Sequence, residues 1–160
     1  MNIDIMSSDK KRTKKTILYL LSKLGSSIEG KKKLMKLMFL LEHYDLSSGK
    51  LTPKGTLDND FYIYHFGVFS TKVMSSFGEL VDEGKIKEGF PLKMIEDGSE
   101  LDLDENIKNR VDTIVEKFGK HSGYQLEVET LEMLGFKPHE KGQYFGQDIA
   151  TILRKTRASG

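Results

Sequence analysis

Hydrophobic residues recur at helical spacing in the first 44 residues of the chain and predict two helices there. The first helix is expected over residues 9–24, and the glycine and serines at 25–27 end it. The second helix is expected over residues 31–44 and is apolar on almost every side between residues 34 and 41. A helix with apolar residues all round is buried, so this second helix is expected at the centre of the fold.

The middle of the chain alternates short apolar segments with turn residues. Residues 61–66 are aromatic and β-branched on both faces and predict a strand covered on both sides. Ser70 is a suitable N-cap for a following helix that ends at Gly84. A hairpin is then predicted, with strands at 85–87 and 92–95.

Three further amphipathic helices are predicted in the last 60 residues. One begins after Asp102 or Asp104, the next is opened by the Ser122 capping box, and the last covers about residues 147–157. The fold class is therefore mainly α (α+β), with a winged-helix-like core of helix, helix, strand, helix and hairpin, followed by C-terminal helices. All 160 residues are expected to form one domain, with residues 1–8 flexible.

The composition indicates a globular protein, with 38% hydrophobic and 31% charged residues. No apolar run reaches the roughly 18–20 residues of a membrane span, so no membrane partner is expected. The chain contains no cysteine, which excludes disulfides and thiol nucleophiles and is typical of a cytoplasmic protein.

No pattern in the chain indicates catalysis. The segment 25–31 has the glycine and lysine spacing of a phosphate-binding loop, but it follows a helix rather than a strand, and Lys32 stands where Ser or Thr would hold magnesium. The four histidines lack the spacing of a zinc site, and the acidic residues are better explained as helix caps and turn formers. We therefore expect a protein without enzymatic activity, cofactor or metal.

Charge is distributed unevenly along the chain. Residues 1–40 carry ten Lys and Arg against three Asp and Glu, a net charge of +7, whereas residues 56–106 have a net charge of −8. One interpretation is that these two regions partly neutralise each other in the fold. The other is that the basic residues bind the phosphates of duplex DNA. The candidates for this second role are Lys11, Arg12, Lys14, Lys15, Lys31, Lys32, Lys33 and Lys36.

Three segments in order resemble motifs of a known family. Lys32–Leu40 is similar to the K-L-x-K-L-x-Y/F helix of the Panacea domain family, the SocA-like antitoxin domain also found in phage-associated proteins, and to the related YwgA-like proteins. Tyr64–Ser70 resembles the family's aromatic-x-x-Gly-Pro segment, although Val68 replaces the proline, and Val115–Leu126 resembles its later turn between two helices. The chain is thus similar to a divergent member.

The resemblance implies a non-enzymatic helical domain that neutralises a cognate toxin by direct binding. The expected function is an antitoxin-like binding module whose partner is a protein, such as a toxin encoded nearby. The alternative is a winged-helix-like DNA-binding transcriptional regulator, and the two functions are compatible. The candidate protein-binding residues are aromatic, namely Tyr62, Tyr64, Phe66 and Phe69. The oligomeric state is left open.

Overall fold

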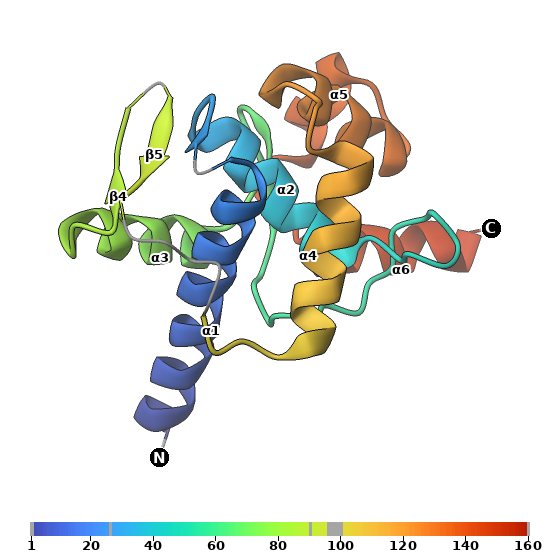
Figure 1. Ribbon diagram of the computed structural model, residues 1–160. Coiled ribbons are helices and arrows are strands. Elements are labelled where there is room, and N and C mark those ends of the chain that lie inside the picture. Colours follow the sequence, from blue (N-terminus) through green and yellow to red (C-terminus); the bar gives the residue numbers. More distant parts are fainter. Residues whose placement is uncertain (1, 26, 90, 96–100, 160) are drawn as a thin grey trace.

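The computed structural model describes residues 2–25, 27–89, 91–95 and 101–159, which form helices interrupted by two short hairpins (Figure 1). In chain order the elements are α1 (Asn2–Lys23), β1 (Ser27–Ile28), α2 (Lys31–His43), β2 (Tyr62–Tyr64), β3 (Gly67–Phe69), α3 (Thr71–Asp82), β4 (Ile86–Lys87), β5 (Leu92–Met94), α4 (Glu105–Phe118), α5 (Gly123–Met133), the 3-10 helix η1 (Pro138–Tyr144) and α6 (Ile149–Ser159). The fold is α+β and mainly helical, as the sequence predicts.

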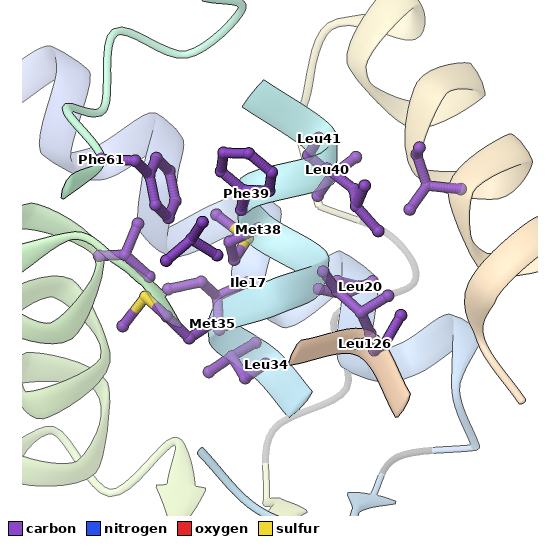
Figure 2. Close-up of a cluster of buried hydrophobic side chains, with 14 of the residues drawn as sticks. Ile17, Leu20, Leu34, Met35, Met38, Phe39, Leu40, Leu41, Phe61 and Leu126 are labelled. Carbon is purple, nitrogen blue, oxygen red and sulfur yellow. The ribbon is translucent and has the colours of Figure 1, made fainter. Parts of the chain in front are cut away.

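Helix α2 is the centre of the core. All its residues from 34 to 43 are buried, and the helix contacts α3, α4, α5 and β3. Figure 2 shows Phe61 on one side of α2 and Leu126 on the other. The Phe39 and Phe61 rings meet edge to face with centroids 5.4 Å apart. Since each buried large apolar side chain contributes about 1.5–3 kcal/mol, the apolar run of α2 accounts for its central position.

A three-stranded antiparallel sheet packs against α1 and α3. Strand β5 lies between β1 and β4, with Ser27 opposite Lys93 and Ile86 opposite Met94. The predicted hairpin at 85–95 is therefore confirmed. The two-residue strand β1 completes the sheet. It is too short to show the alternation of apolar and polar residues that would identify a strand in the sequence.

The predicted single strand over residues 61–66 is wrong. The strand β2 ends at Tyr64, and the chain turns at His65 and Phe66 into β3, which pairs antiparallel with β2. Gly67 has φ +91°, a conformation that suits glycine because it has no side chain. The aromatic run thus folds back on itself and forms a second hairpin between α2 and α3.

Helix boundaries differ from the predicted ones mainly at the ends of the chain. The backbone of α1 is helical from Asn2, earlier than the predicted start at residue 9 and through most of the segment expected to be flexible. Asp104 and Ser122 act as N-caps of α4 and α5, and Ser122 forms its capping box with Gln125. The predicted loop at Pro138 contains the 3-10 helix η1, because a proline at the first position suits a helical turn.

Candidate binding site

Lys36 is a charged residue within the apolar run of α2, and the fold buries it to 2% exposure. Its Nζ donates hydrogen bonds to the backbone carbonyls of Phe66 and Val68, the latter at 2.9 Å. Both carbonyls belong to the turn and second strand of the β2–β3 hairpin. The lysine therefore holds this hairpin against α2, and the sequence-predicted basic residue at 36 is not on an exposed DNA-facing surface.

The environment of Lys36 disfavours its charged form. Burial lowers the pKa of Lys36 to about 7; the carboxylate of Glu127 opposes this shift, whereas the charges of Lys32 and Lys141 add to it. A lysine with this pKa is about half protonated near neutral pH. Its charge is therefore sensitive to any anion that comes close.

Two adjacent cavities open beside Lys36. The first has a volume of about 310 Å³ and is lined by Lys36 and residues 64–69 of the hairpin. The second has a volume of about 400 Å³ and is lined by Lys31, Lys32, Met35, Lys36, Phe66, Phe69 and Met74. These volumes match the lower range of sites for small ligands or for one or two large side chains. Phe66, Phe69 and Lys36 line both cavities.

The exposed aromatic rings of the hairpin form the rim of these cavities. Phe66 is 68% exposed and Tyr64 is 38% exposed. The Tyr64 ring meets Phe69 edge to face at 5.5 Å, and Tyr62 lies 6.3 Å from Tyr64. The structure therefore brings together all four residues that the sequence suggests for protein binding. A fifth aromatic residue, Tyr124, is 69% exposed. The Lys32 ammonium lies 6.0 Å from the centre of the Tyr124 ring and 5.1 Å from the centre of the Phe66 ring.

Glu127 on α5 is a carboxylate that pairs with Lys32, the lysine beside the Phe66 and Tyr124 rings. It is buried, and it forms ion pairs with Lys32 at 2.6 Å and with Lys141 at 2.9 Å. Burial by itself raises the pKa of Glu127, but the hydrogen bonds to the two lysines outweigh it and the pKa lies below its usual value. A Cβ at Gly67 would lie 3.3 Å from Glu127 Cγ, so the hairpin can approach α5 closely because residue 67 is glycine.

Glu127, Lys141 and Tyr124 were not among the predicted site residues. Glu127 and Lys141 are about one hundred residues from Lys36 in sequence, and no spacing pattern connects them. Tyr124 does lie within the third segment of the family resemblance, which is the signal that could have identified it.

Most of the predicted DNA-binding residues make contacts within the protein. On α1, Lys14 forms ion pairs with Glu79 at 3.3 Å and Glu83 at 2.8 Å, both at α3, and Lys10 also pairs with Glu79. Further contacts are Lys31 with Glu88 at 2.6 Å, Arg12 with Asp58 at 3.4 Å, and Lys33 with the carbonyl of Gly119 at 2.7 Å. Lys11 is exposed and Lys15 is half-buried. The basic and acidic regions of the chain thus partly neutralise each other in the fold.

A second polar region lies at the C-terminal end of α2. Glu42 is fully buried and accepts hydrogen bonds from the backbone N–H groups of residues 56–59. His43 Nδ1 lies 2.9 Å from the Thr52 carbonyl, and burial lowers the pKa of this histidine. A cavity of about 190 Å³ lies beside both side chains. Within the described ranges, no three His, Asp or Glu side chains are grouped as a metal site would require.

No family model, curated protein or solved structure matches the chain. No helix among the described residues is long and apolar enough to cross a membrane.

Proposed function

We propose that this protein is an antitoxin-like binding module that acts by direct protein–protein interaction through the β2–β3 hairpin. The observation that carries the proposal is Phe66, a large aromatic side chain that is 68% exposed and lines two adjacent cavities. Exposed apolar groups next to cavities are typical of binding surfaces, and aromatic anchors supply a large share of the binding energy in protein interfaces. Tyr64 lines the first of these cavities with Phe66, and the exposed Tyr124 ring lies, like Phe66, beside the Lys32 ammonium.

The proposal is for binding without catalysis. The polar groups around the cavities are the ammonium of Lys36, which donates to two carbonyls, and the carboxylate of Glu127, which is paired with two lysines. A carboxylate held in two ion pairs with a lowered pKa is a poor general base near neutral pH. These groups are suited to orienting a bound segment.

The proposed partner is the product of a neighbouring gene, acting as a toxin in the cytoplasm. This part rests on the resemblance of the segments at 32–40, 64–70 and 115–126 to the Panacea domain family. One of these segments contains Lys36, another contains Phe66, and the third contains Tyr124. Lys36 and Phe66 line both cavities, and Tyr124 lies beside Lys32, which lines the second.

The test is co-expression of the protein with the product of the adjacent gene, followed by co-purification and measurement of affinity. Phe66→Ala should weaken the complex by at least about 30-fold, the equivalent of roughly 2 kcal/mol for a central aromatic anchor. Ile95→Ala is the matched control, since Ile95 is 63% exposed but lies on the other hairpin, away from the cavities. A gene product that is harmless alone and does not co-purify would remove the antitoxin assignment. An equal affinity of the two variants would remove the hairpin as the binding surface.

One observation favours DNA binding as a second candidate function. Lys87 and Lys93 are exposed and directly opposite each other on the β4–β5 hairpin of the winged-helix-like core. Like charges in this position are unfavourable unless an anion such as a phosphate lies nearby. If the hairpin contacts duplex DNA, changing both lysines to glutamate should weaken binding at about 50 mM salt and make the remaining binding less dependent on salt. Wild-type protein that does not bind duplex DNA at that salt concentration would exclude this function.

A further inference from the structure

The cluster around Glu127 contains more positive than negative charge. Three ammonium groups, those of Lys32, Lys36 and Lys141, act on this one carboxylate. Lys32 and Lys141 lie within ion-pair distance of the Glu127 carboxylate, whereas Lys36 is farther away and interacts with it only electrostatically. With Lys36 protonated, the cluster has an excess of two positive charges. Lys32 and Lys141 are partly exposed to solvent, whereas the Lys36 ammonium is buried. Because a buried charge without a counterion is unfavourable, the cluster is suited to an additional anion beside Lys36.

The hydrogen bonds of Lys36 show where an anion would fit. A neutral amine has two N–H groups, and the carbonyls of Phe66 and Val68 accept two hydrogen bonds from Nζ. Protonation adds a third N–H group, for which the described residues supply no acceptor within hydrogen-bond distance. Lys36 lines both cavities, so this third donor is available to a group that enters them.

The rest of the second cavity is apolar. Its walls are formed by Met35, Phe66, Phe69 and Met74, and its ammonium groups come from the α2 lysines. Lys31 is already paired with Glu88, and Lys32 with Glu127. A ligand complementary to this cavity has an apolar body beside a single carboxylate.

We propose that the cavities beside Phe66 bind a polypeptide segment in which an acidic side chain is adjacent to a large apolar side chain. The carboxylate accepts a hydrogen bond from Lys36 Nζ, and the apolar side chain lies among Met35, Phe69 and Met74. This inference rests on the proposed protein-binding function and specifies the chemistry of the bound segment.

Binding of such a segment is coupled to protonation of Lys36. The charged and titratable groups that face Lys36 or line its cavities are Lys31 and Lys32 on its own helix, Glu127 on α5, Lys141 on η1, and Tyr64 and His65 of the hairpin. Because the pKa of Lys36 in the free protein is about 7, its protonated fraction falls about tenfold from pH 6 to pH 8. The affinity for a carboxylate that requires the protonated amine falls by the same factor.

The experiment uses the intact protein and paired synthetic peptides. Each pair carries a large apolar residue next to Glu in one member and next to Gln in the other, and fluorescence anisotropy measures affinity at pH 6, 7 and 8. The Glu members are expected to bind about tenfold more tightly than the Gln members at pH 6, with little difference at pH 8. The Lys36→Met variant should lose this preference, and Lys117→Met, which changes an exposed lysine on α4, should keep it.

Three outcomes would overturn the inference: equal binding of the paired peptides at pH 6, a preference that survives Lys36→Met, or no binding by any Glu peptide. If Lys36→Met does not fold, the pH profile of the His65→Gln variant decides, because His65 is the other basic side chain that lines the first cavity. A pH-dependent preference that persists in that variant supports Lys36, and its disappearance assigns the effect to His65. The inference can fail while Phe66 is still required for binding the neighbouring gene product, whereas an unaffected Phe66→Ala complex removes the proposed function itself.

Discussion

Helix α2 carries two buried charges six residues apart, Lys36 and Glu42, and the fold satisfies them to different extents. The carboxylate of Glu42 accepts hydrogen bonds from four consecutive backbone N–H groups of the loop at 56–59. The ammonium of Lys36 donates to two carbonyls and lies beside two cavities. A buried charge with all its hydrogen bonds made inside the protein stabilises a local structure, whereas one that retains a donor next to a cavity can bind a ligand.

The loop around Glu42 is shaped by this carboxylate. A Cβ at Gly55 would collide with Glu42 Oε2, and Asp58 adopts φ +60°, which is uncommon for a residue other than glycine. This loop conformation directs the backbone N–H groups of residues 56–59 toward the two carboxylate oxygens of Glu42. Around Lys36 the β2–β3 hairpin instead contributes two backbone carbonyls, and two cavities remain beside the lysine.

The largest expected effect follows from removing the Glu42 carboxylate. Glu42→Ala leaves four backbone N–H groups without their acceptor, and hydrogen bonds to a charged group contribute roughly 1.5–3 kcal/mol each. We expect the free energy of unfolding to fall by at least about 4 kcal/mol, as measured by urea denaturation at pH 7. Glu116→Ala, at an exposed position on α4, is the control and should change stability little. A loss below about 1 kcal/mol for Glu42→Ala would contradict the structural role assigned to this residue.

A smaller effect, distinguished by its pH dependence, is expected at Lys36. The folded-state pKa of about 7 is below the ordinary value of 10.5, so between these values the unfolded chain binds more protons. This group therefore increases stability as the pH rises above 7, by up to about 1.4 kcal/mol per pH unit, and has no effect on the slope well below pH 7.

Urea denaturation of wild type and Lys36→Met between pH 7 and 9 measures this contribution. Relative to the variant, the wild type should gain up to roughly 2–3 kcal/mol over this range. Lys117→Met should follow the wild type. If wild type and Lys36→Met show the same pH dependence, then Lys36 is protonated in the folded protein throughout this range, and the contrast with Glu42 is lost.

The smallest effect is expected for the ion pairs between α1 and α3. Lys14 is partly exposed; burial opposes its charge, but its hydrogen bonds to Glu83 and Glu79 raise its pKa above the ordinary value. Such pairs contribute about 0.2–1 kcal/mol, and salt weakens them. Lys14→Met should therefore lower the free energy of unfolding by less than about 1 kcal/mol, with the difference reduced at 1 M salt. A loss as large as that of Glu42→Ala would show that surface charges are as important for stability as the buried carboxylate.

Much of the helical architecture could be predicted from local pattern. The run from 34 to 41 predicts a central buried helix, and the structure confirms it. The hairpin at 85–95 and the last three helices follow from turn residues, caps and apolar spacing. The turn within residues 61–69 could not be predicted in this way, because the aromatic residues on both sides of it have the same strand preference and the turn depends on the conformation of Gly67.

In the candidate site, too, local sequence pattern identified some residues, whereas contacts between remote residues could not be predicted. Tyr62, Tyr64, Phe66 and Phe69 lie within eight residues of one another, so a local aromatic run identifies them. The basic residues were also evident, but their partners Glu79, Glu83 and Glu88 are more than fifty residues away, and the sequence left open whether the charges meet each other or an external phosphate.

The sequence by itself determined where most of the α-helices lie, which helix is buried, and that one lysine lies within the apolar run of that helix. These properties depend on residues close together in the chain, through backbone propensity and apolar spacing. Only the tertiary structure decided that Lys36 meets two hairpin carbonyls, that Glu127 and Lys141 approach it from α5 and η1, and that cavities remain beside it. Burial and charge interactions depend on distances in space between residues remote in sequence, and these distances determine the pKa of Lys36 and the properties of the site.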